Sequence, residues 1–153
     1  MIPRLNHSEN IPEIVQSFLA ELRQSSFSGD IQHDYGTRLI NSTDNSIYQV
    51  LPQAVVFPKN SSDIQAVLEL TTQQKSCHSI KITARGGGTG TNGQSLTEGI
   101  VLDCSRYMNR ILETNFKQGW VRVEPGVVLD QLNEHLAPQE VFFAPDLSPS
   151  NRA

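Results

Sequence analysis

Segment 54–84 constrains the fold of this 153-residue chain most, because a strand, a helix and a second strand follow one another there. The apolar runs 54–57 and 80–83 have the length of strands, and Pro58 closes the first. Ser62 stands where a side chain can cap a helix between them. Consecutive strands joined by a helix are parallel, with a right-handed crossover, so we expect a small βαβ lobe. The residues that share one face of its helix are Ile64, Val67, Leu68 and Thr71.

A glycine-rich run, 84–95, directly follows the second strand and is the strongest functional signal in the chain. Arg85 opens it, and five glycines fall within eight positions. Glycine costs backbone entropy, so such a cluster favours a loop whose N–H groups wrap closely around an anion. Ligands of open α/β sheets bind at the carboxyl ends of strands, where the expected βαβ unit places this loop. The five glycines are Gly86, Gly87, Gly88, Gly90 and Gly93.

Three other interpretations of the glycine run have to be considered. Gly88, Gly90 and Gly93 form a G-x-G-x-x-G pattern, but a Rossmann site needs a helix next, and only 94–99 precede a new apolar strand. Gln94 stands where the phosphate-binding loop of a nucleotide triphosphatase has lysine, so that class is disfavoured too. A flexible surface turn stays open on the loop alone, because glycine clusters often mean no more.

After the glycine run, the pattern changes to short strands followed by a helix. We expect strands at 100–103, 111–114 and 120–124, with a turn at 117–119 between the last two. Apolar spacing then predicts a short helix within 127–137. The sequence therefore predicts an α+β fold, in which a small βαβ lobe with parallel strands is followed by the start of a second, mainly antiparallel lobe.

Residues 1–46 differ in pattern and are expected to form an N-terminal helical extension to a domain that spans 47–153. An apolar stripe predicts a helix over 12–24, with Pro12 in its first turn. This helix either packs its apolar face on the following domain or provides a contact with another subunit or domain. The polar stretch 25–46 is expected to hold short helical turns and loops.

Composition narrows the classes of function. The net charge is −4, the isoelectric point is about 5.5 and there is no basic run, which argues against nucleic acid as a partner. No run approaches the ~20 apolar residues of a membrane span, and the N-terminus lacks the apolar core of a signal peptide. We therefore expect a cytoplasmic protein, with peripheral association to the inner membrane left open. Cys77 and Cys104 lack metal-site spacing, so we expect reduced thiols and no metal site here.

Several motifs occur in the order and spacing of one known family. They are Val55-Val56-x-Pro58, Arg85-Gly86-Gly87-Gly88-Thr89-Gly90, Val101-Leu102-Asp103-x-Ser105, Val123-Glu124-Pro125-Gly126 and Phe143-x-Pro145-Asp146. On these motifs the chain resembles the FAD-linked oxidase N-terminal domain, the PCMH-type fold of the vanillyl-alcohol oxidase and p-cresol methylhydroxylase superfamily. Segments 42–49 and 85–95 are most similar to large bacterial FAD and iron–sulfur enzymes, the D-2-hydroxyglutarate or D-lactate-type dehydrogenases.

The resemblance implies that FAD lies between the two lobes, with backbone N–H groups of the glycine loop around its pyrophosphate. A second segment, 145–148, would lie beside the isoalloxazine ring or the ribityl chain. Thr89 stands where some family members bind flavin covalently through histidine, so non-covalent FAD is expected. The implied cofactor-binding residues are Arg85, Gly86, Gly87, Gly88, Thr89, Gly90, Thr91, Asn92, Gly93, Gln94, Ser95, Pro145, Asp146 and Ser148.

For the whole enzyme, the resemblance implies oxidation of a D-2-hydroxy acid with hydride transfer to FAD. Electrons would then leave through an iron–sulfur cluster outside this chain or through another acceptor. The chain is expected to be an N-terminal fragment, inactive alone and without a catalytic residue of its own. Two alternatives stay open: an NADPH-dependent reductase of peptidoglycan precursors with the same fold, and a non-redox anion-binding or interaction module.

Overall fold

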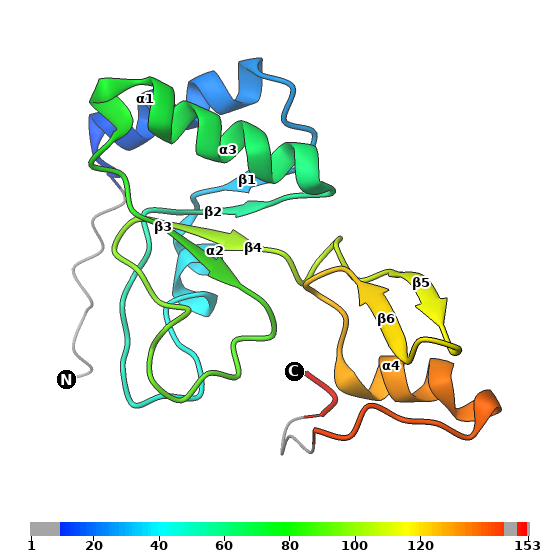
Figure 1. Ribbon diagram of the computed structural model, residues 1–153. Coiled ribbons are helices and arrows are strands. Elements are labelled where there is room, and N and C mark those ends of the chain that lie inside the picture. Colours follow the sequence, from blue (N-terminus) through cyan, green and yellow to red (C-terminus); the bar gives the residue numbers. More distant parts are fainter. Residues whose placement is uncertain (1–9, 146–149, 153) are drawn as a thin grey trace.

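The computed structural model describes residues 10–145 and 150–152, which form two lobes (Figure 1). The first lobe is a four-stranded sheet with helices, and the second is a two-stranded hairpin with a helix. The first lobe contains α1 (Glu13–Gln24), β1 (Asp30–Gln32), α2 (Tyr35–Ile40), β2 (Ala54–Phe57), α3 (Ser61–Gln73), β3 (Ile82–Arg85) and β4 (Ile100–Asp103). The second contains β5 (Ile111–Asn115), β6 (Trp120–Val123) and α4 (Leu129–Leu136). Short 3-10 helices, Lys75–Cys77 and Ala137–Gln139, follow α3 and α4.

The sheet of the first lobe has the strand order β1-β2-β4-β3, so β4 lies between the two strands of the βαβ unit. β4 pairs in parallel with both of them. The parallel strands expected at 54–57 and 80–83 are thus confirmed, although the second begins at Ile82. The place of strand 100–103 in the sequence suggested that it joins the antiparallel strands that follow it, but it does not. It fills the centre of the parallel sheet, where β2 and β4 are buried along their whole length.

The helix expected over 12–24 forms as α1 and packs beside α3 over one face of the sheet (Figure 1). Val15 and Phe18 are among the buried residues that α1 adds to a core shared with β2, β4 and α3. This confirms that the helix packs on the residues that follow it. Pro12 is the N-cap and not part of the first turn, and its carbonyl accepts a hydrogen bond from the N–H of Val15.

The stretch 25–46 contains more than the expected helical turns and loops, because β1 pairs antiparallel with β2 at the edge of the sheet. β1 has only three half-buried residues, too few to show the alternation by which a strand is recognised. α2 is a helical turn of the expected kind, and the Asp34 carboxylate caps it by accepting from the N–H of Thr37. The boundary at residue 46 stays a prediction, although α1 and β1 share a core and a sheet with later residues.

α3 is capped by Asn60, not by Ser62 as predicted. The Asn60 side chain accepts a hydrogen bond from the N–H of Asp63. Asp63 is itself buried, and its carboxylate accepts from the N–H groups of Ser28 and Lys59, both at 2.7 Å. This carboxylate therefore ties the segment that enters β1 to the start of α3.

The second lobe confirms the expected hairpin and helix. β5 and β6 pair antiparallel, and Gly119 makes the turn between them with φ of 70°. The helix expected within 127–137 forms as α4. The base of the hairpin is held by Arg110, whose guanidinium donates to the buried carboxylate of Glu124 at 2.7 Å.

The two cysteines and the helices bear on two further expectations. Cys77 and Cys104 are free thiols, as predicted, and both are buried. Within the residues that the structure describes, no helix is long and apolar enough to cross a membrane. The feature of functional interest is the edge of the sheet at which the parallel strands β2, β3 and β4 end.

Candidate cofactor-binding site

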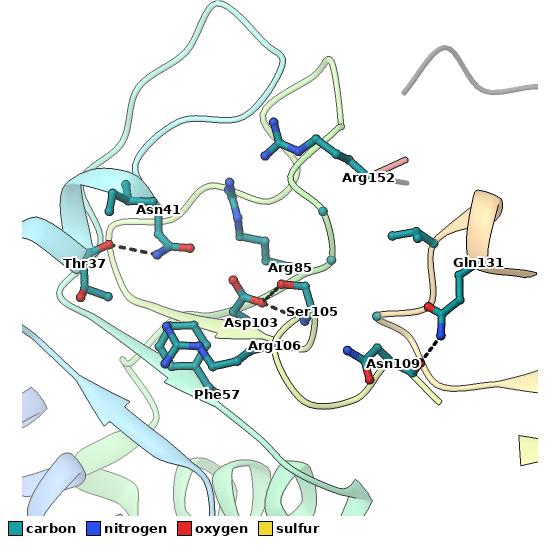
Figure 2. Close-up of a pocket in the computed structure, with 15 residues that line it drawn as sticks. Thr37, Asn41, Phe57, Arg85, Asp103, Ser105, Arg106, Asn109, Gln131 and Arg152 are labelled. Atoms are coloured by element: carbon teal, nitrogen blue, oxygen red, sulfur yellow. Dashed lines mark hydrogen bonds between the residues drawn. The ribbon is translucent and has the colours of Figure 1, made fainter. Parts of the chain in front are cut away.

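An open cavity of about 610 Å³ lies at the carboxyl ends of the parallel strands and is also lined by the second lobe (Figure 2). Phe57, Arg85 and Asp103, the last residues of β2, β3 and β4, line it from the sheet. This is the edge at which open α/β sheets bind their ligands, and the volume is that of a small-molecule or cofactor site. The lining from the second lobe is Gly126, Val128 and Gln131, and α2 with the residue after it adds Thr37, Ile40 and Asn41.

Gly86 and Gly87 form the wall of the cavity next to β3. A Cβ atom added at Gly87 would lie 1.6 Å from the carbonyl oxygen of Arg152, where no side chain fits. One added at Gly86 would lie 3.6 Å from the carbonyl oxygen of Pro125, an ordinary contact. Gly86 and Gly87 thus form a cradle of bare backbone, which at Gly87 packs so closely on the main chain of Arg152 that no side chain fits. Bare backbone suits an anion held closely by main-chain N–H groups.

Two other glycines turn the loop through left-handed backbone conformations. Gly88 has φ of 67°, and a Cβ there would lie 2.3 Å from Nη2 of Arg85. Gly93 has φ of 72°, and a Cβ there would lie 3.0 Å from the ring of Tyr48. These two positions require glycine because of the backbone conformation and of protein side chains that lie against it.

Arg85 and Ser95 meet at the neck of the glycine loop. Nη1 of Arg85 donates to Oγ of Ser95 at 3.3 Å, and Nη2 donates to the carbonyl oxygen of Thr43 at 2.9 Å. Oγ of Ser95 in turn donates to Oδ2 of Asp44 at 3.1 Å. Burial lowers the pKa of the Arg85 guanidinium, and the carboxylates of Asp103 and Asp44 act against that shift. Both predicted residues thus belong to the protein's own hydrogen-bond network at the edge of the cavity.

The remaining predicted residues lie farther from the cavity or beyond the described ranges. The outer part of the loop, which does not belong to the cavity lining, holds Thr89, Gly90, Thr91, Asn92 and Gln94. There the side-chain oxygen of Gln94 accepts from the N–H of Asn92 at 3.1 Å. Pro145 is exposed at the end of the first described range, and Asp146 and Ser148 lie outside the described residues.

Asp103, Ser105 and Arg106 line the cavity but were not among the predicted site residues. Oδ1 of Asp103 accepts from the N–H of Ser105 at 2.8 Å and from its Oγ at 2.6 Å. The Arg106 guanidinium lies over the ring of Phe57, 3.5 Å from its centroid (Figure 2). The signal in the sequence is the polar segment directly after β4, which points to the site only once β4 is known to lie beside β3.

The charges around the cavity favour an anionic ligand. Among the described residues that line it, Arg85, Arg106 and Arg152 outnumber the carboxylate of Asp103. The site thus combines bare glycine backbone at strand ends, excess positive charge and a second lobe that faces the sheet. These features are typical of two-lobed proteins that bind a phosphate-bearing cofactor.

The chain belongs to the FAD binding domain family, which matches residues 52–152. It is 53% identical over 153 residues to D-2-hydroxyglutarate dehydrogenase from Escherichia coli (strain K12), covering 100% of this chain and 15% of that enzyme. In fold it is similar to alkyldihydroxyacetonephosphate synthase, with a TM-score of 0.78 and 17% identity over 94% of this chain and 31% of that one. It is also similar to p-cresol methylhydroxylase, with a TM-score of 0.61 and 18% identity over 84% and 24% of the two chains. The family and these folds confirm the predicted PCMH-type fold.

Proposed function

We propose that this chain is the FAD-binding part of a flavin-dependent dehydrogenase that oxidises a D-2-hydroxy acid, with D-2-hydroxyglutarate as the first candidate substrate. The observation that carries the proposal is the 53% identity, over the whole chain, to D-2-hydroxyglutarate dehydrogenase. Because the chain spans 15% of that enzyme's length, the proposal assigns substrate binding and catalysis to the rest of the full-length gene product.

The diphosphate of FAD would occupy the cavity at the carboxyl ends of the strands. When bound, FAD would supply the acceptor for a hydride from the α-carbon of the substrate. Gly86 and Gly87 would hold the diphosphate through main-chain N–H groups, since a backbone without side chains lets an anion approach closely. Arg106 and Arg152, which line the same cavity, would add positive charge to this contact.

Two other predictions concern the flavin itself. The segment around Pro145, with Asp146 and Ser148, would border the isoalloxazine ring or the ribityl chain. Thr89 offers no imidazole for a covalent link, so FAD would be held non-covalently. Electrons would leave through an iron–sulfur cluster elsewhere in the gene product or through another acceptor.

The test is an anaerobic titration of the purified full-length gene product, followed by its visible absorption spectrum. We expect flavin bands that D-2-hydroxyglutarate bleaches and L-2-hydroxyglutarate does not, with D-lactate as the comparison substrate. Acid precipitation should leave FAD in the supernatant, as a non-covalent cofactor requires.

Other outcomes would point to the alternatives. Bleaching by NADPH but by no D-2-hydroxy acid would favour the peptidoglycan-precursor reductase. Protein that holds no flavin and does not bind added FAD would favour the non-redox anion-binding or interaction module. The identity to a dehydrogenase argues against both alternatives, and the membership in an FAD-binding family argues against the non-redox module.

A further inference from the structure

We propose that Arg85 and Asp44 are positioning residues, which lock the 42–49 loop onto the glycine loop and thereby set the glycine-loop backbone for the cofactor. The inference deepens the proposed function and rests on it only in taking FAD as the cofactor. Both loops extend from the same edge of the first lobe (Figure 1). Contacts between them are made at three places along the glycine loop, at its start, near its outer turn and at its end.

Hydrogen bonds within the 42–49 loop hold its shape. Thr43 and Gln49 form an antiparallel bridge across its base. Oδ1 of Asp44 accepts from the N–H of Ser46 at 2.8 Å, so the carboxylate is fixed to its own turn. The loop therefore presents two acceptors in defined places, the carbonyl oxygen of Thr43 and Oδ2 of Asp44.

Both acceptors receive hydrogen bonds from the two ends of the glycine loop. Arg85, at its start, donates to the carbonyl of Thr43 at 2.9 Å, and Ser95, at its end, donates to Asp44 at 3.1 Å. Arg85 also donates to Ser95 at 3.3 Å, which closes the glycine loop at its neck. Ser95 is only 7% exposed, so the hydroxyl that links Arg85 to Asp44 is largely shielded from water. Closure before the ligand arrives removes conformational freedom that binding would otherwise have to remove.

Two glycines of the run make room for this lock. Gly88 curls over the guanidinium of Arg85, since a Cβ there would lie 2.3 Å from Nη2. Gly93 lies against Tyr48 of the 42–49 loop, since a Cβ there would lie 3.0 Å from the ring. Gly88 and Gly93 thus serve the lock, whereas Gly86 and Gly87 face the cavity.

Removing the charge of Asp44 has opposite expected effects on FAD binding, depending on whether Asp44 positions the loop or acts on FAD by its charge. Burial opposes ionisation of Asp44, but hydrogen bonds from Ser46 and Ser95 and the charge of Arg85 hold its pKa below the usual value. A carboxylate beside a diphosphate site weakens anion binding by charge alone. If Asp44 acts by locking the loop, removing its charge weakens FAD binding, and if charge alone counted, FAD binding would tighten.

The test is FAD affinity in the full-length gene product, measured by titrating FAD into apoprotein that carries Asp44→Asn, Arg85→Met or both. Asparagine supplies one acceptor oxygen where Ser46 and Ser95 need two, so we expect Asp44→Asn to raise the Kd for FAD about tenfold. Because both side chains serve one lock, the double variant should bind about as weakly as Arg85→Met alone. Ser95→Ala is the second variant and should show the same loss. The visible circular dichroism of the flavin, at saturating FAD, should change in all of these variants.

The matched control is Glu98→Gln, which also turns a carboxylate into an amide but at an exposed side chain paired with Lys81. Its FAD affinity and flavin dichroism should equal those of the wild type. Unchanged or tighter FAD binding in Asp44→Asn, or fully additive losses in the double variant, would overturn the lock and leave Arg85 as a direct ligand of the diphosphate. Wild-type protein that binds no FAD would overturn the proposed function itself, and this inference with it.

Discussion

Replacing Gly87 by alanine tests the cradle at its tightest point. The added Cβ would lie 1.6 Å from the Arg152 carbonyl oxygen and 2.8 Å from its carbonyl carbon, where ordinary contacts begin at 3.4 Å. Either the glycine loop or the chain at Arg152 must therefore move by about 1.8 Å. Both atoms belong to the main chain, so no side-chain rotation relieves the clash. An N–H···O hydrogen bond spans about 2.7–3.2 Å, so a movement of this size breaks it.

The expected loss of affinity follows from the main-chain hydrogen bonds to the diphosphate that such a movement breaks. A hydrogen bond to a charged group contributes about 1.5–3 kcal/mol. Since about 1.4 kcal/mol corresponds to a tenfold change in affinity, the Kd for FAD should rise about 10- to 100-fold for each hydrogen bond that is broken. Gly86→Ala is the matched control, because its Cβ would meet only an ordinary contact at 3.6 Å and the residue has no left-handed φ. We expect that control to change binding by less than about 0.5 kcal/mol.

The assay is a fluorescence titration of FAD into apoprotein of the full-length gene product, with the wild type and the two variants side by side. Thermal melts of the apoproteins report separately on folding. Equal affinities of Gly86→Ala and Gly87→Ala, with both apoproteins folded, would refute the cradle. Weaker binding in Gly86→Ala alone would place the diphosphate on the other side of the loop.

Two further predictions concern stability. The buried carboxylate of Asp63 accepts from two N–H groups, those of Ser28 and Lys59, and Asp63→Asn supplies only one acceptor oxygen for them. The substitution should lower the free energy of unfolding of the chain by about 1.5–3 kcal/mol in urea titrations. An unchanged urea midpoint would contradict the assigned role. Hydrogen bonding from Arg110 holds the pKa of Glu124 below its usual 4.5, although burial opposes this. The stabilisation it gives is present above pH 4.5 and is lost as the pH falls through the lowered pKa, so Glu124→Gln should flatten the acid limb of stability against pH. An acid limb identical to that of the wild type would show that the pair does not contribute.

Local patterns predicted most elements because each helix and most strands carry their own signal. The apolar stripe of α1 and the runs at 54–57 and 100–103 need no knowledge of distant contacts. β1 has no such signal, since its three residues become a strand only by pairing with β2. The position of β4 between β2 and β3 is likewise a matter of pairing between strands far apart in the chain, which periodicity does not report.

The same limit explains which part of the site was predicted. The glycine run is contiguous and follows a strand, so its place at the sheet edge could be inferred from order alone. Asp103 and Arg106 join the site because β4 ends beside β3, and Asn41 joins it because α2 packs against β2. The pairing of Asp44 with Ser95 links two loops whose partners are 51 positions apart in the sequence, and neither residue type is distinctive by itself.

The glycine run also shows why one motif can hide two roles. Read as a string, its glycines all suggest backbone wrapped around an anion. In the fold they divide: Gly86 and Gly87 line the cavity, whereas Gly88 and Gly93 turn against Arg85 and Tyr48. A substitution at Gly87 or at Gly93 should weaken the same cofactor's binding, but by different routes. At Gly87 it forces apart the glycine loop and the main chain at Arg152, while at Gly93 it separates the glycine loop from the 42–49 loop before any ligand binds. Affinity alone would not distinguish these routes. Combining each glycine substitution with Asp44→Asn would, because only the second route depends on contacts that Asp44 also makes, so only there should the losses be non-additive.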